Sequence, residues 1–279
     1  MNNYKTRGVI SAFLLLFRDF GKFFKGAALN LFSPSFLFVF IPLLGIWEVL
    51  PRMGIVPSTL VPPISTVLVT LFDMFANRGF LQDIIDSMQK FFMGLSISIL
   101  VAIPLGVFMG WNEAIRKRTL PLFQLLAPIP PPAWVPITII IFGIGTQMQV
   151  FLIFLGTFYP ILFTTFNAVK DTEPRYIASA RAFGASEMTL ILRVYIWHAM
   201  VSIVSSIKTG VSMGLVMLVI AEMYGGRTGI GFVLNEARHF FQISIMVACM
   251  LTLGAIGWFI IEVIKFIELK LSIWKGGRT

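Results

Sequence analysis

The sequence predicts an all-α polytopic membrane protein with six transmembrane helices and an N-terminal interfacial helix. Of its 279 residues, 57% are hydrophobic and only 13% are charged, and the mean hydropathy is +0.87. A water-soluble domain carries about a quarter of charged residues, so a soluble fold is excluded. The third observation is a run from Thr119 to Val169 that contains no Asp, Glu, Lys, Arg or His. Most of the chain is therefore expected to lie in lipid.

Residues 1–34 are expected to form a cytoplasmic or interfacial segment. An apolar stretch at 9–17 resembles the core of a signal peptide, but Arg18, Lys22 and Lys25 follow before any small-residue cluster. Cleavage is therefore not expected. Phenylalanines recur around these lysines, which is typical of a helix lying along the inner leaflet. The alternative is a frayed start to the first span.

The transmembrane domain is predicted at 35–268, followed by a cytoplasmic tail at 269–279. A crossing needs about 20 apolar residues, so the uncharged run must hold two spans. Two glycines and two polar residues at 143–147 interrupt it. The six expected spans are 35–50, 88–111, 120–143, 148–168, 198–221 and 242–264.

The 22 Lys and Arg exceed the 13 Asp and Glu, and their distribution predicts the orientation. With the N-terminus in the cytoplasm, one basic residue, Lys208, lies within a span and 16 lie inside. The remaining five lie outside: Arg52, Arg78, Lys90, Arg227 and Arg238. Because cytoplasmic loops are enriched in Lys and Arg, both termini are expected in the cytoplasm.

The sequence argues against catalysis and against nucleic-acid or metal binding. Its two histidines, His198 and His239, have no metal-ligand or nucleophile-activating spacing, and Cys249 is the single cysteine. No phosphate-binding GxxxxGK[ST] occurs, and no basic run is interleaved with aromatics in a polar segment. We expect no enzyme activity, no bound cofactor, no metal and no nucleic acid.

The largest polar loop predicted on the cytoplasmic side is 170–193. Glu173 and Pro174 suit the first turn of a helix, alanines keep it thin, and Gly184 ends it. A thin helix that ends at glycine can dock into a cleft on another protein.

This loop resembles the EAA loop of bacterial ABC-importer permeases. In the stretch 178–186, Ala180 and Gly184 match that pattern, while Ala178 stands for its glutamate and Ser179 for its first alanine. Trp197 stands where the family has proline. The segments 60–66, 127–136 with 142–145, and 221–231 are similar to the nitrate, sulfonate, taurine and bicarbonate branch. The resemblance covers residues 36–268.

The resemblance implies a type I importer permease in the bacterial inner membrane that carries a small anion. Its partners would be a second permease copy, two ATPase subunits that use ATP and magnesium, and a periplasmic binding protein. The loop would be the coupling helix, with contacts from Arg175, Tyr176, Ala178, Ser179, Ala180, Arg181, Phe183 and Gly184. The competing class is a secondary carrier or channel without ATPase partners; a membrane scaffold is a third possibility.

Three features are candidates for a translocation pathway. A proline cluster that includes Pro131 and Pro132 must break its helix, and a broken helix is tolerated beside protein or a wet cavity, although simple kinking remains an alternative. Lys208 lies within a span and must be paired or hydrated, with substrate attraction as the other reading. A hydroxyl stripe could line the pathway or pack against a helix: Ser202, Ser205, Ser206, Thr209 and Ser212.

Charged residues on the expected outer rim are candidates for docking the binding protein. They are Glu222, Arg227, Glu236 and Arg238. Solvated loop charges are the alternative interpretation.

Overall fold

The computed structural model describes residues 33–274 together with Gly21, Phe23, Lys25 and Gly26, and no β-strand occurs among them. The all-α prediction is confirmed for this part of the chain. The interfacial helix predicted within 1–34 lies almost entirely outside the described residues.

Eleven α-helices occur in the described ranges, with one 3₁₀ turn (Pro131–Trp134) and one π turn (Ile191–Tyr195). The helices are α2 (Pro34–Arg52), α3 (Ile64–Asn77), α4 (Phe80–Trp111), α5 (Glu113–Leu126), α6 (Val135–Phe142), α7 (Thr146–Lys170), α8 (Pro174–Ala182), α9 (Glu187–Leu190), α10 (Ile196–Gly225), α11 (Ile230–His239) and α12 (Ile243–Trp274).

Four of the described helical segments are long and apolar enough to cross a membrane, or five if the bent pair of α5 and α6 is one span. The four are Phe80–Trp111, Thr146–Lys170, Glu187–Gly225 and Ile243–Leu271. The first predicted span falls within α2, which is not one of these five. The predicted count of six spans is therefore not confirmed.

The predicted break in the uncharged run is confirmed. α6 ends at Phe142 and α7 begins at Thr146. Gly143 and Gly145 between them have φ of 72° and 153°, a backbone region that residues with a Cβ rarely adopt. The two glycines therefore provide the turn that lets two helices share one apolar run.

The chain divides into two compact units, residues 1–66 and 67–279. In the first unit, α2 is fastened to the loop that follows it. The Glu48 carboxylate accepts hydrogen bonds from the backbone N–H and the hydroxyl of Ser65, at 3.1 and 2.8 Å, and Trp47 Nε1 donates to the Pro62 carbonyl.

The core of the second unit is the packing of α7 against both α4 and α10. Its buried residues include Phe91 and Leu95 of α4, Ile161 of α7, and Val211 and Leu218 of α10. A Cβ on Gly106 would lie 2.9 Å from the carbonyl oxygen of Leu162, so α4 approaches the α7 backbone directly. The missing side chain of Gly106 therefore lets the two helices pack closely.

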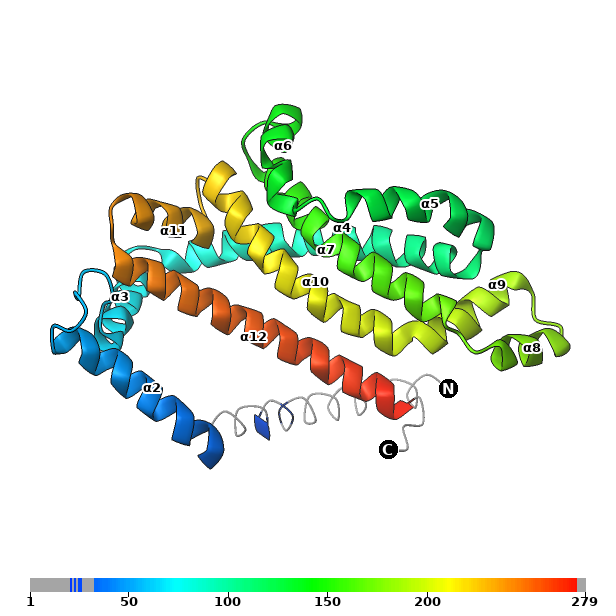
Figure 1. The fold of residues 1–279 in the computed structure, drawn as a ribbon, viewed down its shortest axis with the longest axis horizontal. Coiled ribbons are helices and arrows are strands. Elements are labelled where there is room, and N and C mark those ends of the chain that lie inside the picture. Colours follow the sequence, from blue (N-terminus) through cyan, green and yellow to red (C-terminus); the bar gives the residue numbers. More distant parts are fainter. Residues whose placement is uncertain (1–20, 22, 24, 27–32, 275–279) are drawn as a thin grey trace, which may run out of the picture. The chain divides into compact units, whose positions relative to one another are not determined.

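The ends of this unit are defined by two short helices. A continuous 39-residue helical segment, Glu187–Gly225, combines α9, the π turn and α10, and at 1.5 Å per residue it is about 58 Å long. α8 precedes this segment and α11 follows it. They consequently lie at opposite ends of α10 (Figure 1).

Candidate functional site

The predicted helix in the 170–193 loop exists as α8, and both of its ends match the sequence signals. Glu173 is its N-cap and Pro174 its first residue. At the other end, Gly184 N–H donates to the Arg181 carbonyl and Ala185 N–H to the Ala180 carbonyl, at 2.9 and 3.1 Å. This is a Schellman C-cap, and Gly184 provides its left-handed residue with φ of 74°. The helix thus ends where the sequence predicts.

The surface of α8 is open in the isolated chain. Arg175, Tyr176 and Arg181 are exposed, and the Phe183 side chain at the C-cap is 92% exposed. Ala178 and Ser179 are also exposed, and Ala180 is half-buried. A phenylalanine exposed to this degree beside two arginines is typical of a surface that meets another protein.

The charges on α8 are paired locally. Arg175 forms an ion pair with Glu173 and lies over the Tyr176 ring, 5.0 Å from its centroid. The Glu173 carboxylate raises the pKa of the Arg175 guanidinium above its ordinary value. The Arg175 charge is therefore compensated by a neighbouring residue of the same helix start.

α8 is also tied to the membrane helices through one carboxylate, Glu187. Arg181 Nη2 donates to Glu187 Oε1 at 3.0 Å, and Trp111 Nε1 at the end of α4 donates to Glu187 Oε2 at 3.2 Å. Glu187 begins the long segment that continues into α10. These contacts of Trp111, Glu187 and Arg181, which we call the α8 junction, therefore link α8 to both α4 and α10.

A cavity of about 630 Å³ lies beside α8. Its lining includes Tyr176 and Ser179 of α8, Arg193 of the π turn, and Trp197 and His198 of α10. The Tyr176 and His198 rings lie 6.0 Å apart. A π turn is frequently a functional feature of a helix, and here it adjoins the cavity.

The proline cluster breaks its helix as predicted. α5 and the segment Pro131–Phe142 are bent by 86° at the break. Pro131 is half-buried and Pro132 exposed, while Val135 packs against Met148 of α7 and Met217 of α10. The irregular backbone is therefore supported by the helices that form the core.

The predicted hydroxyl stripe on α10 divides into two faces. Ser206 is buried in line with Gly210 and Gly214, and a Cβ on Gly214 would lie 2.6 Å from Cγ2 of Thr157. Ser202, Thr209 and Ser212 are exposed and Ser205 is half-buried. The packing interpretation applies to Ser206, whose face packs on α7. The other four hydroxyls form an open face in the isolated chain, and pathway lining stays a prediction for them.

Lys208 is paired within the chain. Its Nζ donates to Oε2 of Glu268 on α12 at 2.5 Å, and about a quarter of each side chain is exposed. The expected pairing is therefore present, and the partner is a carboxylate near the end of α12.

At the other end of α10, Glu222 is not an exposed rim charge, and this expectation was wrong. Its side chain is fully buried and forms an ion pair with Lys90 of α4, with 2.9 Å between Nζ and Oε1. The Ser87 hydroxyl also contacts both carboxylate oxygens. Lys90 was expected outside the membrane, yet α4 begins at Phe80 rather than near 88, so Lys90 is helical and 7% exposed.

The remaining docking candidates are accessible. Arg227, Glu236 and Arg238 are exposed on the glycine loop and α11. Arg238 Nη2 donates to Asn235 Oδ1 at 2.9 Å, and Asn235 Nδ2 donates to the Met223 carbonyl at 3.2 Å. Within the described part of the chain, no group of three or more His, Cys, Asp or Glu side chains could hold a metal ion.

Sequence comparison decides the family. Residues 102–271, more than half of the chain, match the family described as the inner membrane component of binding-protein-dependent transport systems. The chain belongs to this family. It is an ABC importer permease, a multi-pass inner-membrane protein, and the matched residues run from the second half of α4 into α12.

Individual relatives match the sequence of this permease over most of its length. A putative ABC transporter permease of Methanocaldococcus jannaschii is 30% identical over 256 residues, which are 90% of this chain and 93% of the relative. The taurine transport system permease of Escherichia coli is 26% identical over 84% of this chain and 87% of its own length. A solved structure of the MetNI methionine ABC transporter has a similar fold, with a TM-score of 0.62 at 17% identity, covering 69% of this chain and 95% of that one.

Proposed function

We propose that this permease carries a small anion of the nitrate, sulfonate, taurine or bicarbonate class, driven by separate ATPase subunits. Two copies would form the pathway, two ATPases would bind on the cytoplasmic side, and a periplasmic protein would deliver the anion. No chemistry on the substrate is implied, and ATP with magnesium would be used on the partner chains.

The observation that carries ATPase coupling is the construction of α8. It is an exposed helix with defined ends, it presents Phe183 to solvent, and Glu187 links it to α4 and α10. A rigid helix with an aromatic side chain at its tip fits a groove on a partner. Displacement of α8 by an ATPase would be transmitted directly to the long membrane helices.

The taurine permease among the relatives and the sequence segments shared with the anion branch support the anion class. The open face of α10 offers hydroxyl donors for an anion from Ser202, Ser205 and Thr209. The Ser212 hydroxyl on the same face donates to the Lys208 carbonyl at 3.2 Å. Lys208 is committed to Glu268, so we assign it to holding α10 against α12 rather than to binding substrate.

The test of ATPase coupling is co-purification from the native membrane in mild detergent. We expect the wild-type permease to retain its ATPases, and Phe183→Asp and Arg181→Glu to lose them together with uptake. Phe241→Asp is the matched control, because Phe241 is also an exposed phenylalanine, at 82%, but lies just after α11 at the opposite end. Uptake without any associated ATPase, insensitive to Arg181→Glu, would instead establish a secondary carrier or channel.

The anion is best identified on the binding protein encoded beside this permease, because in such importers that protein does most of the selection. Binding of nitrate, taurine and bicarbonate to the purified protein should show one clear preference. If it binds none of these anions and instead binds a cation or a sugar, the anion assignment is wrong.

A further inference from the structure

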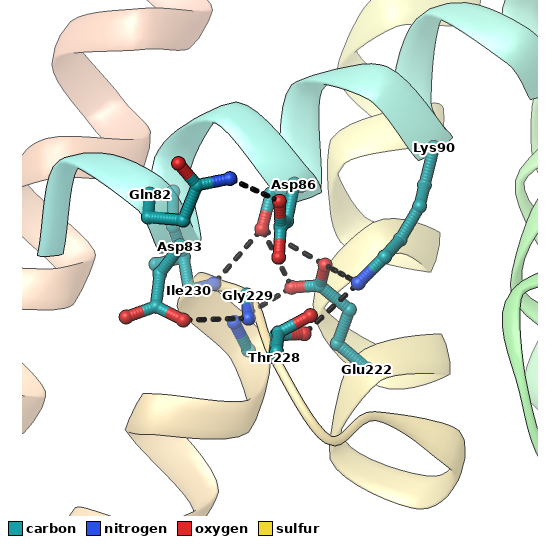
Figure 2. A network of polar contacts seen from close by, with 10 residues as sticks. Gln82, Asp83, Asp86, Lys90, Glu222, Thr228, Gly229 and Ile230 are labelled. Carbon is teal, nitrogen blue, oxygen red and sulfur yellow. Dashed lines mark hydrogen bonds and ion pairs between the residues drawn. The ribbon is translucent and has the colours of Figure 1, made fainter. Parts of the chain in front are cut away.

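Side chains from two other helix segments hold the glycine loop 226–229 and the start of α11 through their backbone groups. Ile230 N–H donates to the Ser87 hydroxyl and Gly231 N–H to Glu222 Oε2, both at 2.8 Å. Gly229 N–H donates to Asp83 Oδ1 at 2.9 Å, and Lys90 Nζ donates to the Thr228 carbonyl, also at 2.9 Å (Figure 2). Four consecutive residues of the chain are thus held by side chains from α4 and α10.

The side chains from α4 come from one face of the helix. Asp83, Ser87 and Lys90 are spaced by four and three residues, so they point in the same direction. Glu222, one turn before the end of α10, completes the set. We refer to Asp83, Ser87, Lys90 and Glu222 as the outer cluster.

Because two charges of the outer cluster are buried, each of them needs its partner in place. Glu222 is 0% and Lys90 7% exposed, and removing one member of a buried ion pair leaves the other charge without compensation. Gly229 is equally constrained, since its φ is 114° and a Cβ there would lie 2.2 Å from Glu222 Oε1. In the observed conformation the loop satisfies all of these groups.

The outer cluster also stands at the far end of the helices that reach α8. α4 carries Lys90 in its first half and Trp111 at its end, and the segment Glu187–Gly225 carries Glu187 at its start and Glu222 near its end. Lys90 bonds Glu222 at one end of this pair, and Trp111 bonds Glu187 at the other. The same two helices are therefore joined twice, once beside α11 and once beside α8.

We propose that the outer cluster is a positioning set: it fixes the glycine loop and α11 on α4 and α10, so that docking of the binding protein there alters ATP hydrolysis by the ATPases that bind at α8. This inference rests on the proposed function. A partner that shifts α11 would move α4 and α10 with it, because residues 228–231 are all bonded to side chains of these two helices. The other ends of the same helices meet at the α8 junction of Trp111, Glu187 and Arg181.

The test compares variants of the assembled complex by two measurements. The first is ATP hydrolysis with and without the binding protein encoded beside the permease, in a mixture of nitrate, taurine and bicarbonate. The second is hydrogen exchange at the amides of 229–231. Asp83→Ala is the safest variant for folding, because Asp83 is only half-buried. Asp86→Ala is its control, since that carboxylate accepts from Gln82 of the same helix at 2.8 Å.

We expect Asp83→Ala to speed exchange and to lower stimulation by the binding protein about two- to tenfold, with basal hydrolysis unchanged, while Asp86→Ala changes neither. Lys90→Met combined with Glu222→Gln removes both buried charges together and should have a larger effect in the same direction. Unchanged exchange in these variants overturns the positioning role. Faster exchange with normal stimulation overturns the link to α8.

A wild-type complex that the binding protein does not stimulate would contradict the proposed function instead. The exchange measurement would still test whether the outer cluster holds the loop, so the two failures are distinguishable.

Discussion

At the residue scale, the pairing of Lys208 with Glu268 leads to a prediction that separates two roles for this lysine, structural pairing and attraction of the substrate. Lys208→Met leaves the partly buried Glu268 carboxylate without its partner. Because both side chains are about a quarter exposed, we expect the free energy of unfolding to fall by only about 1–2 kcal/mol. Replacing both residues by Met should recover most of this stability and also uptake. The measurement is the thermal unfolding midpoint in detergent, alongside anion uptake in cells.

If Lys208 attracts the substrate, the double variant should give a different uptake result. Stability would recover while uptake stayed low, because no cation would remain for the anion. Glu268→Gln alone serves as the control, since it removes the pair and keeps the lysine charge.

Gly214 permits a second residue-scale prediction. A Cβ at this position would lie 2.6 Å from Thr157 Cγ2 and 3.0 Å from Phe91 Cε2, so Gly214→Ala forces α10 away from α7 and α4. Overpacking of this kind costs about 1–3 kcal/mol. Gly254→Ala on α12 is the matched control, because a Cβ there meets nothing within 4 Å. The unfolding midpoint should fall for the first variant only; an equal fall in both would contradict the packing argument.

The sequence identifies which residues are unusual more reliably than where they point. Lys208 stands out because a charge within a span needs a partner, but its partner is 60 residues away and no local pattern names Glu268. The sequence predicts Glu222 as a charge on the outer rim because it follows the end of an apolar stretch. Its burial depends on Lys90, which belongs to a helix that begins eight residues earlier than hydropathy suggests. One signal was present in the sequence: Asp83, Ser87 and Lys90 share a helical face.

At the element scale, α10 should show two chemically different faces. In a background of Cys249→Ser, Cys substituted for Ser205 or Thr209 should react with a charged, water-soluble thiol reagent. Cys substituted for Ser206 should be protected, because Ser206 is 1% exposed and faces α7. The rates are measured in membranes with and without ATP. Protection at all three positions would mean that the open face meets lipid or another protein surface rather than water.

Breaks between elements could be predicted from sequence because they depend on local chemistry. Gly143 and Gly145, the proline cluster and the Glu173–Pro174 start of α8 each act through their own backbone geometry. The π turn at Ile191–Tyr195 could not be predicted, since nothing in its composition marks it. Likewise, the polar first turns of α4 are typical of a loop by composition alone. Their polar side chains are bonded by Glu222 and the glycine loop, which are far away in the sequence.

At the scale of the whole molecule, burial of Lys90 sharpens the charge asymmetry that predicts orientation. In residues 67–279, the exposed basic residues toward the α11 end are Arg78, Arg227 and Arg238. The region around α8 carries more exposed basic residues: Lys117, Arg118, Lys170, Arg175, Arg181 and Arg193. Because cytoplasmic loops attract Lys and Arg, α8 is expected inside and α11 outside.

Two exposed phenylalanines make this orientation measurable. With Cys249→Ser as background, Phe183→Cys reports on the α8 end and Phe241→Cys on the α11 end, at 92% and 82% exposure in the native chain. A membrane-impermeant maleimide should label Phe241→Cys in intact cells and Phe183→Cys only in inverted vesicles. The continuous segment from Glu187 to Gly225, about 58 Å long, keeps the two sites on opposite sides of a bilayer core about 30 Å thick. Reversed labelling would place α8 away from cytoplasmic ATP, and the proposed coupling to ATPases would then be physically impossible.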